Sequence, residues 1–282
     1  MVREILAIPD GLAGVVWPFW PLRPTDGRYH HTHEELECNL VTRGEASYLI
    51  GSDRVLLRPG RLVWLFPEQA HVLLGETPDF AMWICVARQA LLARHCTTPE
   101  TAMLRQGDPG APIVATLDAD TAHRLHLLCE RLATERDDAA TFDAGLAWLI
   151  LSAWHATRLA RAHATSANIH PAVARAAFLL CDEAAPASLA DLARQCGLSA
   201  AHLSRLFARE LGLSIPAYRN RQRIERALGR LAQGRRINLL TVALESGFGS
   251  YAQFHRVFKQ VMGTGPAAYL RERAGGNSSG QK

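Results

Sequence analysis

The C-terminal part of the chain contains two closely similar stretches. SGFGSYAQFHRVFKQVMGTGPAAY spans Ser246–Tyr269, and CGLSAAHLSRLFARELGLSIPAY spans Cys196–Tyr218. With one extra residue in the second copy, the same kinds of side chain recur in register, which indicates a duplicated module. The matching pairs are Leu189 and Leu239, Ala193 and Ala243, Gly197 and Gly247, Leu203 and Phe254, Arg205 and Arg256, Phe207 and Phe258, Gly212 and Gly263, and Tyr218 and Tyr269.

Each copy predicts a helix, a tight turn and a second helix. Leu239, Val242 and Ala243 lie three and four residues apart, which places them on one face of a short helix. Gly247 suits the left-handed turn that follows, and Ser250 suits the N-cap of the next helix. That helix has an apolar stripe of Phe254, Val257, Phe258 and Val261. The first copy repeats the pattern with Gly197, Ser199, Leu203, Leu206, Phe207 and Leu211.

The faces opposite the two apolar stripes differ between the copies and carry small or basic residues. Similar cores with different outward side chains suit two readers of different DNA segments, because helix side chains read base edges in the major groove. The alternative is two ordinary helical hairpins with solvated polar faces. The predicted DNA-contacting residues are Ala201, His202, Ser204, Arg205, Arg209, Ser250, Tyr251, Ala252, His255, Arg256 and Lys259.

The segment Ile215–Gly234 between the copies predicts one long helix, with Pro216 in its first turn. A helix of this length spans about 27 Å and could hold two recognition helices about one duplex turn apart. Its arginines are expected to divide between DNA phosphates, solvent and pairing with Glu225. They are Arg219, Arg221, Arg223, Arg226 and Arg230.

Residues 171–273 resemble the DNA-binding domain of the AraC/XylS family of bacterial transcription regulators. The resemblance implies a sequence-specific regulator of transcription, not an enzyme, with two recognition helices in successive major grooves. It places base-reading positions at Ala201, Ser204 and Arg205, and at Ala252, His255 and Arg256. Gly265 departs from the family pattern, as do the small Ala201 and Ser204. The residues that carry the resemblance are Gly247, Phe248, Phe254, Phe258, Lys259, Gly263, Pro266 and Tyr269.

Charge is distributed unevenly along the chain. Ser166–Lys282 contains sixteen basic and seven acidic residues, whereas Met1–Thr165 contains fifteen basic and twenty acidic residues. The whole-chain net charge of +4 hides this difference. A basic C-terminal part joined to an acidic N-terminal part is typical of a DNA-binding module attached to a domain of another kind.

The N-terminal part predicts short strands separated by Gly, Pro, Asp and Ser, typical of a β-barrel or sandwich. Within it, HTHEELECNLVTRG spans His31–Gly44, and four of its polar side chains share parity on a continuous strand. This segment resembles the first motif of the cupin fold, and His71 resembles the single histidine of the second, although Gln69 departs from it. The resemblance implies a site formed by His31, His33, Glu37 and His71.

These residues suit one transition metal ion, or they bind a small-molecule effector, or they only hydrogen-bond one another. Aromatic residues near them either pack in the core or line an apolar cavity with the His/Glu cluster as its polar anchor. The aromatic residues are Trp17, Phe19, Trp20, Trp64, Phe66 and Trp83.

Two amphipathic helices are predicted between the barrel and the DNA-binding module, and they either cover the barrel or form a homodimer interface. Their apolar seams contain Thr121, Leu125, Leu128 and Leu132, and then Leu146, Leu149, Ile150, Ala153 and Leu159.

The predicted class is α+β. The expected domains are a cupin-like sensor barrel over 1–115, the helical pair over 116–165, the DNA-binding domain over 166–273 and a disordered tail over 274–282.

Six cysteines without paired spacing, and an N-terminus without a long apolar stretch, predict a cytoplasmic protein without a membrane partner. The expected partners are double-stranded DNA, a small-molecule or metal effector, a second copy and, for an activator, RNA polymerase. The alternatives are a cupin enzyme, such as a metal-dependent dioxygenase or isomerase, and a regulator that senses the metal itself.

Overall fold

The computed structural model describes residues 2–3, 6, 8–20, 31–136, 138–160, 166–181, 188–232 and 238–276. The chain divides between Arg175 and Ala176 into two compact units. The first is rich in antiparallel β-structure, and we call it the β-rich unit. The second is helical, and we call it the helical unit. This arrangement confirms the predicted α+β class. In the part of the chain described, no helix is both long and apolar enough to cross a membrane.

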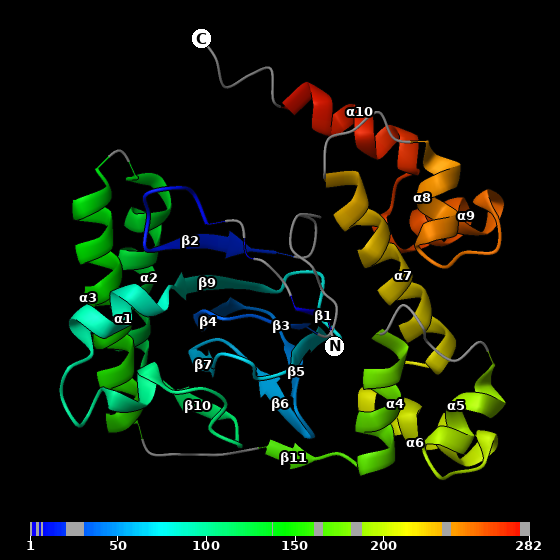
Figure 1. Ribbon diagram of the computed structural model, residues 1–282, viewed down its shortest axis with the longest axis horizontal. Helices are drawn as coiled ribbons and strands as arrows, with labels where there is room; N and C mark the ends of the chain where they lie inside the picture. The colour runs from blue at the N-terminus through cyan, green and yellow to red at the C-terminus, as the bar shows by residue number, and fades with distance from the viewer. Residues whose placement is uncertain are drawn as a thin grey trace. The chain divides into compact units, whose positions relative to one another are not determined.

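The β-rich unit contains two sheets whose buried residues form a single hydrophobic core (Figure 1). One sheet has the order β1-β3-β8-β5-β6-β11, and the other has the order β10-β7-β4-β9-β2. Neighbouring strands pair antiparallel, apart from the parallel pair β1 and β3. The strands are β1 (Val2–Arg3), β2 (Gly14–Phe19), β3 (His31–Thr32), β4 (Leu36–Arg43), β5 (Ala46–Ile50), β6 (Asp53–Leu57), β7 (Arg61–Leu65), β8 (His71–Leu74), β9 (Ala81–Ala87), β10 (Ile113–Thr116) and β11 (Ser166–Asn168).

Helices cover one face of the second sheet. α2 packs on β2, β4 and β9, and its buried Leu125, Cys129 and Leu132 join the core of the β-rich unit. β9 is buried at every position because one of its faces lines the interior and α2 covers the other. α3 also packs on β2 and β10. Of the two alternatives for the helical pair, the structure thus shows that it covers the barrel, and the homodimer interface stays a prediction. The helices of this unit are α1 (Gln89–His95), η1 (Ala102–Arg105), α2 (Ala119–Thr134) and α3 (Ala139–Leu159).

Two features of the β-rich unit differ from the sequence prediction. The segment from His31 to Glu37 is not a continuous strand, because β3 ends at Thr32 and β4 begins at Leu36. After residues 161–165, which lie outside the described part, β11 pairs antiparallel with β6. The chain therefore returns to the sheet beyond 166, where the DNA-binding domain was expected to begin, and the units divide later.

The helical unit contains the two predicted helix-turn-helix elements. α5 and α6 form the first, α8 and α9 form the second, and α7 contacts α6, α8 and α9 (Figure 1). Val261 is 42% exposed, so the predicted apolar stripe of α9 ends at Phe258. α10 continues to Gly276, beyond Ala274, where the tail was predicted to begin; residues 277–282 lie outside the described part. The helices are α4 (Pro171–Cys181), α5 (Leu189–Gln195), α6 (Ala200–Leu211), α7 (Ile215–Ala232), α8 (Leu239–Glu245), α9 (Tyr251–Met262) and α10 (Pro266–Gly276).

Candidate functional site

The two helix-turn-helix elements use the same turn. Gly197 and Gly247 have φ values of +71° and +89°, in the left-handed region that favours glycine. After each glycine, a backbone N–H reaches back to an alanine carbonyl of the preceding helix at 3.0 Å, from Leu198 in one copy and Phe248 in the other. The predicted turns are therefore confirmed, and both copies redirect the chain by the same backbone hydrogen bond.

Serine side chains hold the N-termini of α6 and α9. Ser199 Oγ accepts from the N–H of His202 at 3.3 Å, and Ser250 Oγ accepts from the N–H of Gln253 at 3.2 Å. These bonds satisfy backbone donors that have no partner within the helix. Both predicted caps are confirmed, and they set where α6 and α9 begin.

The predicted DNA-contacting residues all lie at the surface of the helical unit. Ser204 and Tyr251 are half-buried, and the other predicted residues on α6 and α9 are exposed. Tyr251 also packs against the rings of Phe254 and His255, which gives it a structural role. Contact of these residues with DNA stays a prediction. Those whose side chains are exposed are Ala201, His202, Arg205, Arg209, Ser250, Ala252, His255, Arg256 and Lys259.

The outward faces of α6 and α9 each contain two exposed basic side chains. α9 contains Arg256 and Lys259 and no acidic residue along its whole length. On α6, Arg209 donates to the carboxylate of Glu210 at 3.0 Å, so this arginine already has an anionic neighbour. Exposed cations without carboxylates beside them attract phosphate, and α9 therefore presents the less compensated positive surface.

The arginines of α7 largely support the helical unit itself. The guanidinium of Arg223 lies 5.8 Å from the ring centre of Phe248, and Arg226 donates to the carbonyl of Leu180 at 3.3 Å. Arg230 Nε lies 3.3 Å from Glu245 Oε2 on α8. Burial and neighbouring arginines lower the pKa of Arg223. These three side chains connect α7 to its neighbours, which accounts for so many arginines on one connecting helix.

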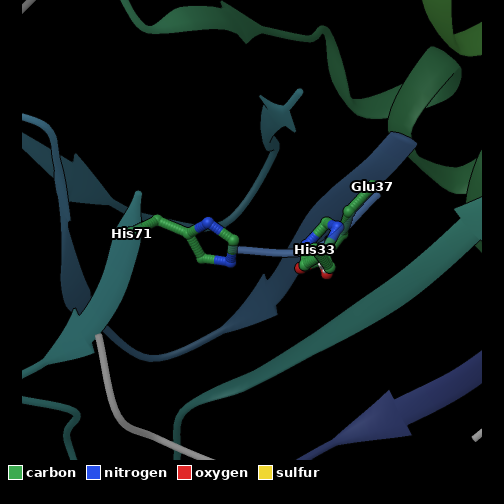
Figure 2. Close-up of side chains that lie close together, drawn as sticks. All are labelled: His33, Glu37 and His71. Atoms are coloured by element: carbon green, nitrogen blue, oxygen red, sulfur yellow. Dashed lines mark ion pairs between the residues drawn. The ribbon is translucent and has the colours of Figure 1, made fainter. Parts of the chain in front are cut away.

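A second polar site lies in the core of the β-rich unit, where His33, Glu37 and His71 come together. All three are buried, and one ligand atom of each lies within 4.8 Å of the other two. Figure 2 shows the imidazole of His71 pointing from β8 toward His33 and Glu37. The structure thus brings together three of the four predicted residues. The side chain of the fourth, His31, lies outside the described part of the chain.

Hydrogen bonds orient all three side chains. Nδ1 of His33 donates to the carbonyl of Glu35, and Nδ1 of His71 donates to the carbonyl of Gln69, each at 2.9 Å. Because a carbonyl only accepts, both protons are placed on Nδ1, and Nε2 of each ring is left for the cluster. His33 Nε2 lies 3.2 Å from Glu37 Oε2. Two lone pairs at that distance repel unless a proton or a metal ion lies between them.

The charges within the cluster favour the ionised carboxylate. Burial alone opposes ionisation of Glu37, but its hydrogen bonds and its attraction to the histidines outweigh burial and lower its pKa to about 2. Burial likewise opposes protonation of His33, yet the bond to Glu37 and its charge raise the pKa of the imidazole. An ionised carboxylate facing two imidazole nitrogens is a donor set that binds divalent transition metals.

Sequence reasoning missed two members of this site, Asn39 and Tyr48. Asn39 Nδ2 donates to Glu37 Oε1 at 2.6 Å and to the hydroxyl of Tyr48 at 2.9 Å. The sequence could have predicted Asn39, because it lies two residues after Glu37 on β4 and therefore points to the same face of the sheet. Tyr48 comes from β5, and only the pairing of the strands shows that it belongs here.

Gln69, the departure from the cupin pattern, has a structural role. Its Oε1 accepts from the N–H of Phe66 at 3.3 Å, and its Nε2 donates to Asp108 at 3.0 Å. These bonds hold the loop before β8, from which the backbone carbonyl of Gln69 orients His71.

Comparisons with known proteins agree with this two-part organisation. Residues 23–151 match the family described as AraC-like ligand binding domain, and residues 192–272 match the family described as helix-turn-helix domain. The chain belongs to the AraC family. This AraC-family chain is thus a transcription regulator with an N-terminal ligand-binding domain and a C-terminal helix-turn-helix domain, and neither matched family is catalytic.

Relatives of this AraC-family regulator carry matching descriptions. An uncharacterized HTH-type transcriptional regulator, YfiF of Bacillus subtilis, is 26% identical over 85% of this chain and 77% of its own. The arabinose operon regulatory protein of Salmonella typhimurium is 25% identical over 82% of each chain. The solved structure of ToxT from Vibrio cholerae is similar with a TM-score of 0.39 and 11% identity, covering 91% of this chain and 97% of that one.

Proposed function

We propose that this regulator binds a specific DNA sequence by inserting α6 and α9 into adjacent major grooves. The observation that carries the proposal is the duplicated element: two copies with the same turn, the same serine cap and buried stripes, but different outward side chains. Arginine paired with guanine is the commonest specific contact. Arg205 on α6 and Arg256 on α9 occupy equivalent outward positions, and each would read one base pair of its own groove.

Selection of binding sites from random double-stranded DNA tests this proposal. With full-length protein, the selected sequence is expected to contain two blocks separated by about one helical turn, 10–10.5 base pairs. Arg256→Ala should cost about 1–3 kcal/mol of binding free energy and relax one position in one block. Arg205→Ala should relax a position in the other block. Arg105→Ala, an exposed change on η1 in the β-rich unit, is the control. An unchanged selected sequence and affinity in the Arg256→Ala and Arg205→Ala proteins would contradict the proposal.

We also propose that the regulator acts as a homodimer through α2 and α3. A groove of about 650 Å³ lies between these helices, lined by apolar side chains such as Leu128 and Leu151. Trp148 at its edge is 63% exposed, and Leu159 is 71% exposed. Large apolar side chains that remain exposed together on one surface mark interaction sites. A second copy covering this face would bring two pairs of recognition helices to DNA together.

The His33–Glu37–His71 cluster is proposed to hold a divalent transition metal ion. Ligand atoms bound to one ion at about 2.0–2.2 Å lie about 3 Å apart, and the 3.2 Å between His33 Nε2 and Glu37 Oε2 matches this spacing. The bonds from each Nδ1 to a backbone carbonyl fix the tautomer that exposes Nε2, as in metal sites generally. A bound ion would neutralise the carboxylate and offer open positions to a polar group of an effector.

Regulation then requires that the effector or metal bind two arrangements of the dimer with different affinity. The bound state would change which DNA half-sites the two protomers occupy together. DNA as the target places this action in the cytoplasm. A regulator that activates transcription would also contact RNA polymerase.

A further inference from the structure

A groove on the outer side of the β-rich unit is separate from the buried histidine cluster. It has a volume of about 870 Å³ and lies where α2 meets the ends of β2, β4 and β9. This volume is in the range of small-molecule sites, about 300–1,000 Å³. The residues used below line it: Leu40, Arg43, Trp83, Ala122, His123 and His126.

Strand alternation separates the groove from the cluster. Asn39 points to the interior, where it binds Glu37 and Tyr48. The next residue, Leu40, therefore points to the opposite face, and its antiparallel partner Trp83 points the same way. Trp83 confirms this direction, because its indole N–H reaches His126 on α2. Of the two alternatives from the sequence, core packing therefore holds for Trp83, and a cavity anchored by the His/Glu cluster does not.

The apolar wall of the groove is held in place by α2. Trp83 Nε1 donates to Nδ1 of His126 at 2.6 Å. Because indole only donates, Nδ1 is the acceptor, which places a proton of His126 on Nε2. That nitrogen lies 3.4 Å from Glu130 Oε1. The polar atom of Trp83 is satisfied within the protein, and the residue is only 7% exposed, so the indole forms a fixed part of the apolar floor of the groove.

The rim of the groove is cationic at one end. The side chain of Arg43 is exposed, and among the residues that the structure describes it makes no hydrogen bond or ion pair. His123 is also exposed and lies beside His126. Of the described residues that line the groove, only Glu130 is acidic, and its carboxylate faces His126. An anionic group entering at Arg43 therefore meets a cation that no carboxylate in the described part of the chain neutralises.

We propose that this groove binds a small molecule with an apolar, ring-sized body and one carboxylate. The body lies in the groove against Ala122 and the floor to which Leu40 and Trp83 contribute, and the carboxylate pairs with Arg43 in the bidentate geometry that guanidinium favours. Such a ligand touches both the sheet and α2. If the homodimer forms as proposed above, the ligand would stabilise α2 in one position and so act on the dimer. Binding itself does not depend on that proposal.

Titration calorimetry on the full-length protein, without DNA, tests the site. The probes are 4-phenylbutanoate and its uncharged analogue 4-phenylbutan-1-ol. Arg43→Gln is expected to weaken binding of the acid about ten-fold and to leave binding of the alcohol unchanged. Ala122→Phe fills the groove and is expected to abolish binding of both. Arg105→Gln removes an exposed charge from η1, outside the groove, and should bind as the unaltered protein does.

Four results would overturn the proposal. The first is no saturable binding of the acid below about 1 mM. The second is equal affinity of the acid for the unaltered and Arg43→Gln proteins. The third is an equal loss of binding affinity for the acid and for the alcohol in the Arg43→Gln protein. The fourth is unchanged binding in Ala122→Phe, whose folding is checked by circular dichroism. Because no DNA is present, these results are independent of the DNA-binding proposal.

Discussion

His33 and His71 each donate a hydrogen bond to a backbone carbonyl two residues away. The acceptor is the carbonyl of Glu35, which follows His33 in the sequence, and that of Gln69, which precedes His71. Both arrangements leave Nε2 directed at Glu37. Asn39 holds the other oxygen of that carboxylate. The cluster is therefore oriented by bonds that exist before any ion arrives, which reduces the entropy lost on binding.

Metal binding by the cluster is predicted to depend on Glu37 and on Asn39, which donates a hydrogen bond to its carboxylate. Protein purified without a histidine tag and loaded with Zn²⁺ should hold a stoichiometric ion by mass spectrometry. Glu37→Gln keeps the side-chain shape, removes the charge and should lower the affinity by about 100-fold or more, and Asn39→Ala by about 10–100-fold. His126→Ala, on α2 outside the cluster, is the control. Zinc binding of equal strength in the Glu37→Gln protein would show that the cluster holds no metal.

At the scale of elements, the glycine turns were predictable because their signals are local. A helix period, a glycine and a serine within a few residues specify a turn and a cap without reference to the rest of the chain. The turns nevertheless differ in their surroundings. A Cβ at Gly247 would lie 3.3 Å from Nε of Arg223, whereas a Cβ at Gly197 would meet nothing within 4 Å. Only the packing of α7 against α8 and α9 creates this difference.

Replacing each of the two turn glycines by alanine is predicted to show how much stability depends on the left-handed backbone and how much on contact with Arg223. Gly197→Ala and Gly247→Ala should each lower the free energy of unfolding by about 1–2 kcal/mol, because both have left-handed backbones. Gly247→Ala should lower the free energy of unfolding more than Gly197→Ala does, because the side chain of Arg223 must also move. Gly229 lies within α7, and an added Cβ there would meet nothing within 4 Å, so Gly229→Ala should raise the free energy of unfolding by about 0.5–1 kcal/mol.

Urea unfolding followed by circular dichroism measures these differences. A Gly247→Ala protein as stable as the unaltered chain would show that the turn does not need a left-handed residue. Equal losses at Gly197 and Gly247 would show that contact with Arg223 carries no cost.

At the scale of the whole molecule, α2 and α3 have an apolar face that the described part of the chain leaves exposed. Trp148 and Leu159 lie on it. Their neighbours in sequence, such as Leu149 and Ile150, are buried in the core of the β-rich unit. The same helices thus cover the sheet with one face and leave another exposed, so the covering role that the structure shows is compatible with the proposed homodimer interface.

Dimerisation is predicted to fail when this face becomes charged. Trp148→Asp should raise the dimer dissociation constant by about 30-fold or more, the size of effect found for buried aromatic anchors. Analytical ultracentrifugation over a range of protein concentrations measures it. Met103→Asp, an exposed apolar residue on η1, is the matched control and should not alter association. A Trp148→Asp protein that associates as strongly as the unaltered chain would exclude this face as the interface.

The sequence by itself determined the helical unit almost completely, because its turns, caps and most of its buried stripes depend on residues close together in the chain. It also pointed to His33, Glu37 and His71, through the resemblance to the two cupin motifs. Tertiary structure decided what long-range pairing creates: the break between β3 and β4, the place of Tyr48, the return of β11 to the sheet and the direction of Trp83. Side chains from distant strands meet only when the register of the sheets is set, and no local pattern contains that register.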